Sequence, residues 1–290
     1  MSNPDQIQRI LFDELDIRGV VSGLQQTCAD CFEKHNYPAV IQQVLGEMLA
    51  AVSLLSSNLK FEGRLILQAQ GQGNVRLLMA ECTHKRDVRA IARYDGDIPQ
   101  NASFTELLPQ GQVVLTVEPE KGHRYQGVVP LTGDTLAKCL ESYFISSEQL
   151  PTQVHLASDG ERAAGMLLQV LPADGTGEED WERISHLAST LKSSELLQLD
   201  NQTLLYRLFH EENCRLYEPD SVQFRCTCSR ERSAASLKMV EKKELLEVLE
   251  EHGAINVNCQ FCNADYAFDR TDIEALFSEG GSAANPDQLH

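Results

Sequence analysis

The stretch Cys226-Thr227-Cys228, followed after thirty residues by Cys259-Gln260-Phe261-Cys262, decides the fold of the C-terminal part of the chain. Two close pairs of thiolates suit a closed tetrahedral zinc site, because each pair can occupy two corners while the fold brings the pairs together. A Cys-x-x-Cys followed by Asn or Gly is usual in zinc knuckles, whereas a Cys-x-Cys arm is rarer. The spacing therefore predicts one Zn²⁺ per chain, bound by Cys226, Cys228, Cys259 and Cys262.

The residues around these pairs predict a small domain that depends on its metal. A helix rich in Glu and Lys is expected through Leu237, Val240, Leu245 and Val248 or Leu249, ending at Gly253. Strands are expected at 255–257 and 266–268, and Thr271-Asp272-Ile273-Glu274 has the pattern of a capping box that opens a final helix. Such a domain has little core, and structural zinc contributes about 10–16 kcal/mol in isolated sites near neutral pH.

The N-terminal two-thirds predicts a mixed α/β domain in which strands come as hairpins. Apolar residues recur at three- and four-residue steps from Val40 to Leu55, which predicts one buried face of a long helix. Gly71-Gln72-Gly73-Asn74 is expected to join two strands, and a second helix is expected over 134–146. Sequential hairpins favour an α+β fold over a doubly wound sheet. Strands are expected at 10–24 (with turns), 61–68, 75–79, 88–94, 113–118, 125–129, 154–157 and 165–171.

A small, acidic stretch over 172–180 marks a change in character towards amphipathic helices that run from Trp181 to Phe209. Short amphipathic helices are unstable alone in water, so these must pack on a partner domain or another chain. The predicted organisation is an α+β domain for substrate binding and dimerisation (1–175), an amphipathic helical linker (176–220), a zinc-binding redox-switch domain (221–278) and a disordered tail (279–290).

Composition limits the classes of partner. The 290 residues carry a formal net charge of -18, which disfavours binding to nucleic acid or an anionic membrane. The mean hydropathy of -0.28 and the lack of a long apolar run argue against a membrane protein. Nothing at the N-terminus resembles a secretion signal, so we expect the protein to be cytoplasmic and its thiols to be reduced. The nine cysteines cannot all pair within one chain.

Other candidate sites are weaker. Cys28-Ala29-Asp30-Cys31 lacks the flanking features of a thioredoxin-like motif and is interpreted as two helix cysteines, and Cys82, Cys139 and Cys214 as packed thiols. No nucleotide or nucleophile motif is present, so we expect neither a nucleotide ligand nor an enzyme. We interpret the basic cluster of Lys85, Arg86, Arg89 and Arg93 as a solvated face. We interpret His252 as a positive charge that complements a helix C-terminus. Positive charge also flanks the first cysteine pair, at Arg225, Arg230 and Arg232, which either lower the pKa of the thiols or are simply solvated.

The signature Phe224-Arg225-Cys226-Thr227-Cys228-Ser229-Arg230-Glu231-Arg232, with Cys259-Gln260-Phe261-Cys262-Asn263, resembles that of the 33 kDa chaperonin family of redox-regulated heat-shock chaperones. Weaker matches, such as Phe61-Glu62-Gly63-Arg64 and Ala92-Arg93-Tyr94-Asp95-Gly96, extend the resemblance over nearly the whole chain.

The resemblance implies an ATP-independent holdase that is inactive when reduced and zinc-bound. In the family, oxidative stress forms the two local disulfides, which here are Cys226-Cys228 and Cys259-Cys262. Zinc then leaves, the linker unfolds, and the chain dimerises and holds unfolding client proteins. Cys28 and Cys31 have no counterpart in that motif.

Two alternatives remain at this stage. A structural zinc ribbon could bind nucleic acid, although the charge of -18 counts against it. A thiol-disulfide oxidoreductase could use Cys28 and Cys31, or Cys259 and Cys262.

Overall fold

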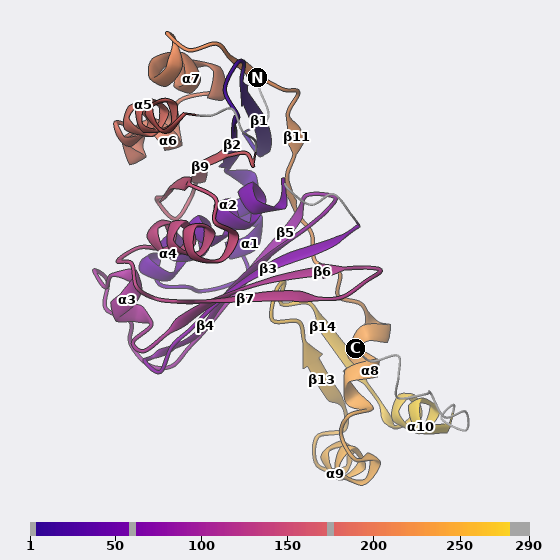
Figure 1. Cartoon of the computed structure of the whole chain (residues 1–290). Helices are drawn as coiled ribbons and strands as arrows, with labels where there is room; N and C mark the ends of the chain where they lie inside the picture. Colours follow the sequence, from indigo (N-terminus) through magenta and orange to yellow (C-terminus); the bar gives the residue numbers. More distant parts are fainter. Residues whose placement is uncertain (1–3, 58–61, 173–176, 279–290) are drawn as a thin grey trace. The chain divides into compact units, whose positions relative to one another are not determined.

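The computed structural model describes residues 4–57, 62–172 and 177–278, and the predicted tail at 279–290 lies outside this range. The expected α+β fold class is confirmed, because hairpin-rich sheets and helices make up the chain (Figure 1). The cysteine cluster lies towards the C-terminal end of the sequence. The chain divides into two compact units, Met1–Arg225 and Cys226–His290.

The first sheet of the N-terminal unit has the strand order β10-β1-β2-β9-β8, and β11 also pairs with β1. The expected single stretch from Ile10 to Leu24 is two antiparallel strands, because Glu14 turns the chain with a φ of 69°. The strands are β1 (Gln6–Phe12), β2 (Ile17–Leu24), β8 (Thr152–Ser158), β9 (Ala163–Val170), β10 (Cys214–Leu216) and β11 (Asp220–Ser221).

The second sheet has the order β12-β5-β4-β3-β6-β7 and is antiparallel except where β12 joins β5 in parallel. The expected hairpin through residues 71–74 joins β3 to β4. The strands are β3 (Gly63–Gln70), β4 (Val75–Thr83), β5 (Asp87–Tyr94), β6 (Gln112–Pro119), β7 (Tyr125–Pro130) and β12 (Gln223–Phe224).

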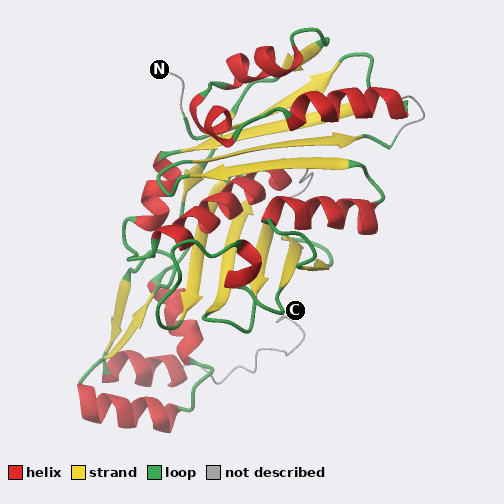
Figure 2. Cartoon of the chain, turned by 90° about the vertical axis from the view of Figure 1, so that its left-hand side faces the viewer, coloured by secondary structure: helices red, strands yellow, loops and turns green. Residues whose placement is uncertain are grey.

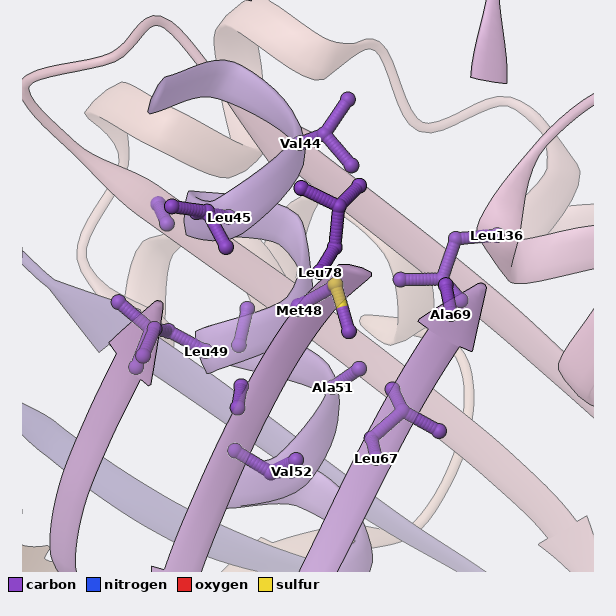
Figure 3. Close-up of a cluster of buried hydrophobic side chains, with 14 of the residues drawn as sticks. Val44, Leu45, Met48, Leu49, Ala51, Val52, Leu67, Ala69, Leu78 and Leu136 are labelled. Atoms are coloured by element: carbon purple, nitrogen blue, oxygen red, sulfur yellow. The ribbon is translucent and has the colours of Figure 1, made fainter. Parts of the chain in front are cut away.

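The helix α2 (Ala39–Ser56) contacts strands of both sheets and lies between them (Figure 2). Its side chains Val44, Met48 and Val52 approach Leu67 and Leu78 of the second sheet (Figure 3). Among the described residues, α2 is the one helix whose length and mean hydropathy of 1.5 would also suit a membrane span, but 78% of that window is buried inside the protein. It is the core helix that the apolar spacing predicts.

Three short helices complete this core: α1 (Gln26–Phe32), α3 (Phe104–Leu107) and α4 (Leu136–Tyr143). The helix expected over 134–146 is α4 followed by a π-helical turn at Phe144–Glu148, which ends where Gln149 adopts a φ of 56°.

The amphipathic segment folds onto the other face of the first sheet as α5 (Glu178–Ser189), α6 (Ser193–Gln198) and α7 (Asn201–Phe209). Ile184, Leu204 and Phe209 pack against sheet residues such as Phe12 and Met166, and all of these are at most 2% exposed. The partner that these helices require is therefore the chain's own sheet.

A strap, residues 220–225, ends the N-terminal unit. Ser221 pairs with Gln6 of the first sheet, and Phe224 pairs with Val88 of the second. Between them Val222 is only 3% exposed and belongs to the main core. The strap therefore binds both sheets immediately before the first cysteine of the C-terminal unit.

The C-terminal unit contains α8 (Arg230–Leu237), α9 (Lys242–His252), β13 (Ile255–Asn258), β14 (Asp265–Phe268) and α10 (Arg270–Ser278). The single helix expected before Gly253 is divided into two helices, α8 and α9. Gly253 ends α9 with a φ of 78°, as expected for a left-handed C-cap. The expected capping box at Thr271 and Glu274 is wrong: Asp269 accepts a hydrogen bond from the Asp272 amide (2.9 Å), and Asp272 accepts one from the Asp269 amide (2.9 Å).

Candidate metal centre

Two local structures place the four cysteines. Cys226 and Cys228 lie in an extended arm that leads into α8, where Ser229 is the N-cap and accepts a hydrogen bond from the Arg232 amide. Cys259 and Cys262 lie in the tight turn between β13 and β14. Asn263 closes this turn with a φ of 54° and donates its amide to the Cys259 carbonyl at 2.7 Å. Asn tolerates this left-handed backbone better than most residues.

The four Sγ atoms lie within 4.8 Å of one another. Sγ of Cys226 is 3.6 Å from that of Cys259, and Sγ of Cys228 is 3.4 Å from that of Cys262. A tetrahedron with zinc–sulfur bonds of about 2.3 Å has sulfur–sulfur edges of about 3.8 Å. The cluster is therefore close to the size of a tetrahedral thiolate site and could hold one metal ion.

The electrostatics of the cluster favour a cation. Burial raises the pKa of Cys226, and burial together with the neighbouring thiols raises the pKa of Cys262 to about 12. Burial also acts to raise the pKa of Cys228, but hydrogen bonds from the Tyr266 hydroxyl and from the other thiols outweigh it and lower the pKa to about 7. Four thiols packed this closely cannot all ionise unless a cation compensates their charge.

Tyr266 is a site residue that the sequence analysis missed. Tyr266 lies on strand β14, and its hydroxyl donates a hydrogen bond to Sγ of Cys228 at a distance of 3.1 Å. The sequence identified it only as a strand residue, because nothing in the local pattern shows which thiol its side chain faces.

Arg230 and Arg232, beside the first cysteine pair, form hydrogen bonds with backbone carbonyls rather than lying free in solvent. The Arg232 guanidinium donates to the carbonyl and the hydroxyl of Thr227 at 2.8 and 2.7 Å, which fixes the residue between Cys226 and Cys228. Arg230 donates to the Ala267 carbonyl and pairs with Asp272 at 2.6 Å. These contacts support the arm and the strand that carry the cysteines.

The remaining candidates do not join the cluster. Cys28, Cys82 and Cys139 are completely buried and Cys31 is 1% exposed, as expected of packed thiols, while Cys214 is half-buried. His252 is 69% exposed at the end of α9 and lies 3.8 Å from Glu251.

The prediction of a solvated basic face is wrong for Arg86 and Arg89, whose side chains are only 15% and 12% exposed and bind separate partners. Arg86 donates to the Ser56 carbonyl at 2.7 Å and belongs to the core edge. Arg89 pairs with the buried Glu81 at 2.7 Å. Arg225, on the strap, has its guanidinium 4.0 Å from Asp87. None of these contacts converges on a common anion site.

The sequence model of the family described as "Hsp33 protein" matches residues 5–269. The chain therefore belongs to the Hsp33 family. It is 51% identical to the 33 kDa chaperonin of Pseudomonas paraeruginosa over 97% of both chains, and 50% identical to that of Azotobacter vinelandii over 98% of both. Among solved structures, the 33 kDa chaperonin (heat shock protein 33 homolog) of Thermotoga maritima matches with a TM-score of 0.85 at 25% identity, covering 96% of this chain and 99% of that one.

These findings confirm the resemblance drawn from the cysteine signature. As an Hsp33 family member, the chain is a heat-shock chaperone, and its relatives are named as chaperonins rather than as enzymes. The fold agrees over 96% of the chain.

Proposed function

We propose that this Hsp33 family member is a redox-switched, ATP-independent holdase. In the reduced state Cys226, Cys228, Cys259 and Cys262 bind one Zn²⁺ and the chain is inactive. Oxidation to the disulfides Cys226-Cys228 and Cys259-Cys262 releases the ion and activates the chain, which then dimerises and binds unfolding proteins in the cytoplasm. Residues 1–175 bind clients and dimerise, 176–220 form the linker, 221–278 the switch and 279–290 a disordered tail.

The observation that carries this proposal is the cluster of four Sγ atoms within 4.8 Å. Its all-thiolate donor set suits Zn²⁺ better than Mg²⁺ or Ca²⁺, which prefer oxygen ligands. Bound zinc would cross-link the two cysteine pairs and would therefore stabilise the folded state of the C-terminal unit. The unit needs this contribution, because the core of its described part is small. Partly buried neighbours pack on six buried side chains: Leu237, Leu245, Leu249, Ile255, Phe268 and Ile273.

The oxidation chemistry is balanced by one peroxide molecule for each pair. A thiolate attacks a peroxide oxygen to give a sulfenic acid and hydroxide, and the second thiolate then attacks that sulfur to form the disulfide and release a second hydroxide. Each hydroxide takes up a proton from solvent and becomes water. The short separation along the chain favours Cys226-Cys228 and Cys259-Cys262. The sulfur contacts at 3.6 and 3.4 Å instead join Cys226 to Cys259 and Cys228 to Cys262, so disulfide mapping is part of the test.

The strap supports a route from the switch to the linker. Loss of the ion unfolds the C-terminal unit from Cys226, which directly follows Arg225 of the strap. The linker helices then lose their connection to a folded unit, and their release uncovers the apolar face of the first sheet formed by residues such as Phe12, Ile17 and Met166. That face is suited to hold apolar segments of an unfolding protein.

The test combines light scattering of an aggregating client with a zinc and thiol count on the full chain. We expect the peroxide-treated chain to suppress aggregation without ATP, after release of one zinc ion and loss of four thiols, and the reduced chain not to. The matched control is Cys214→Ser, which should switch normally, whereas Cys228→Ser should bind zinc weakly. Equal suppression by both redox forms would contradict the switch, and retained zinc would indicate a structural ribbon.

A further inference from the structure

Cys28 and Cys31 lie three residues apart on α1, and both side chains belong to the main core, where they are at most 1% exposed. The helix that carries them packs on β5 of the second sheet and on α2, the helix between the two sheets. Neither thiol is therefore open to solvent while α1 stays packed.

The N-terminus of α1 is capped by a distant carboxylate. Asp5, itself only 4% exposed, accepts hydrogen bonds from the amides of Gln25, Gln26 and Thr27 at 2.9, 3.0 and 2.7 Å. Its carbonyl accepts the amide of Val222 at 3.0 Å. A single residue therefore joins the start of α1 to the strap.

The strap covers this end of α1 with further contacts. The Thr27 hydroxyl donates to the Val222 carbonyl at 3.5 Å, and α1 packs on α2, β5 and β12. Only three residues separate Val222 from Cys226. Release of the strap would remove both the cover of α1 and one of the groups that holds its cap.

An α-helical backbone disfavours a disulfide between residues three apart. Residues three apart on a helix have Cβ atoms about 5–6 Å apart, whereas a disulfide requires about 3.5–4.5 Å. The helix has only seven residues, and isolated helices of this length are unstable in water. Loss of the cap and the strap would therefore both unwind α1 and let the two sulfurs meet.

We propose that Cys28 and Cys31 are a second, latent redox site that forms a disulfide only after the strap leaves α1. This proposal rests on the proposed function, since activation at the four-cysteine cluster is what loosens the strap. The disulfide holds the helix unwound, so the chain returns to its resting fold only after a dithiol reductant has opened this bond.

The oxidant is hydrogen peroxide and the step is balanced. The Cys28 thiolate, whose proton has gone to solvent, attacks a peroxide oxygen; the O–O bond breaks and the products are a sulfenic acid and hydroxide. The Cys31 thiolate then attacks the Cys28 sulfur, the S–O bond breaks, the S–S bond forms and a second hydroxide leaves. The two hydroxides take up the two protons that the thiols released. Two thiols are oxidised and one peroxide is reduced to two waters.

The resting state protects the pair. Burial, followed by the negative charges of Asp5 and Asp159, raises the pKa of Cys28 to about 12, so almost none of it is the reactive thiolate. A solvent-exposed cysteine has a pKa of about 8.5, so exposure increases the thiolate fraction about three-thousandfold at neutral pH. The site therefore becomes reactive when it opens.

The experiment is differential alkylation of the full chain with peptide mass spectrometry, during peroxide treatment, with zinc release followed in the same samples. We expect zinc release and oxidation of the four cluster cysteines first, then a slower Cys28-Cys31 disulfide. Asp5→Ala removes the cap and should accelerate the second step about tenfold, while Glu211→Ala, which removes an exposed carboxylate just after α7, should leave it unchanged.

The outcomes separate the two proposals. If zinc leaves on oxidation but Cys28 and Cys31 stay reduced in both the parent chain and Asp5→Ala, the latent site is wrong and the switch stands. If zinc is retained, the switch is wrong, and rapid Cys28-Cys31 oxidation in Asp5→Ala still supports the latent site. Should Asp5→Ala not fold, Thr27→Val opens the same end of α1 by removing only the hydrogen bond to Val222.

Discussion

The Tyr266 hydroxyl donates a hydrogen bond to Sγ of Cys228 at 3.1 Å, which joins strand β14 to the Cys-x-Cys arm. The arm has no strand or helix of its own between Phe224 and Arg230. Its position depends on this hydrogen bond, on the contacts of Arg232 with Thr227, and on the bound ion in our proposal. Tyr266 therefore orients a ligand in the way that outer-shell partners do in metal sites.

Replacing Tyr266 by Phe should weaken metal binding by the reduced chain by about 10- to 100-fold, because Cys228 loses a hydrogen bond to its thiolate. Competition against a chromophoric chelator measures this affinity. Tyr206→Phe is the matched control, since Tyr206 is 72% exposed on α7 and has no part in the cluster. An unchanged affinity in Tyr266→Phe would show that the hydrogen bond does not support the ligand.

The docking of α7 should control activity without any oxidant. Phe209 is 1% exposed and packs edge-to-face on Phe12, with ring centroids 5.1 Å apart. Phe209→Ala should destabilise this packing by about 3–5 kcal/mol. The reduced variant should bind a hydrophobic dye and suppress client aggregation while it keeps its metal. Tyr206→Ala, on the exposed side of the same helix, should do neither, and a Phe209→Ala chain as inactive as the parent would contradict the role of this face.

The cysteine spacing predicted the cluster because the type of the ligand residues and their separation along the chain determine whether they can bind a metal together. Cys226, Cys228, Cys259 and Cys262 come within 4.8 Å of one another, as that spacing indicated. The main helix was equally predictable, since an apolar period over Ala39–Ser56 follows directly from burial between two sheets. Both features depend on patterns that are local or that repeat.

Contacts between distant residues could not be predicted in this way. Tyr266 meets Cys228 from 38 positions away, and Asp5 caps α1 from 22 positions before Thr27. The split of Ile10 to Leu24 into two strands depends on the pairing of β1 with β2, which sequence periodicity does not show. Such contacts are set by tertiary packing rather than by local preference.

A half-buried carboxyl group in the core helix should make stability depend on pH. Burial raises the pKa of Glu47 from an ordinary 4.5 to about 7. The folded chain therefore binds this proton more tightly than the unfolded chain, so stability is fully present below pH 4.5 and is lost as the pH rises through 7. The full loss is about 3 kcal/mol.

The variant Glu47→Gln removes this titration and should stabilise the chain by up to about 3 kcal/mol at pH 8, and by less than about 1 kcal/mol at pH 5. Denaturant unfolding at both pH values, with the metal bound, measures the difference. The surface variant Glu120→Gln is the control and should show no such pH dependence. An equal effect of Glu47→Gln at both pH values would mean that Glu47 is not protonated in the fold.

The start of α10 offers a direct comparison between the structure and the sequence pattern. Asp269 and Asp272 exchange hydrogen bonds with each other's backbone amides, both at 2.9 Å, whereas Thr271 lies inside the helix. Asp269→Ala should therefore destabilise the C-terminal unit by about 1 kcal/mol, a typical value for a lost N-cap. Because α10 contributes Ile273 to the small core, the same variant should lose its metal to a chelator faster. Thr271→Ala should change neither property by a comparable amount, and a larger effect of Thr271→Ala than of Asp269→Ala on chelator-driven metal loss would favour the capping box that the sequence pattern predicts.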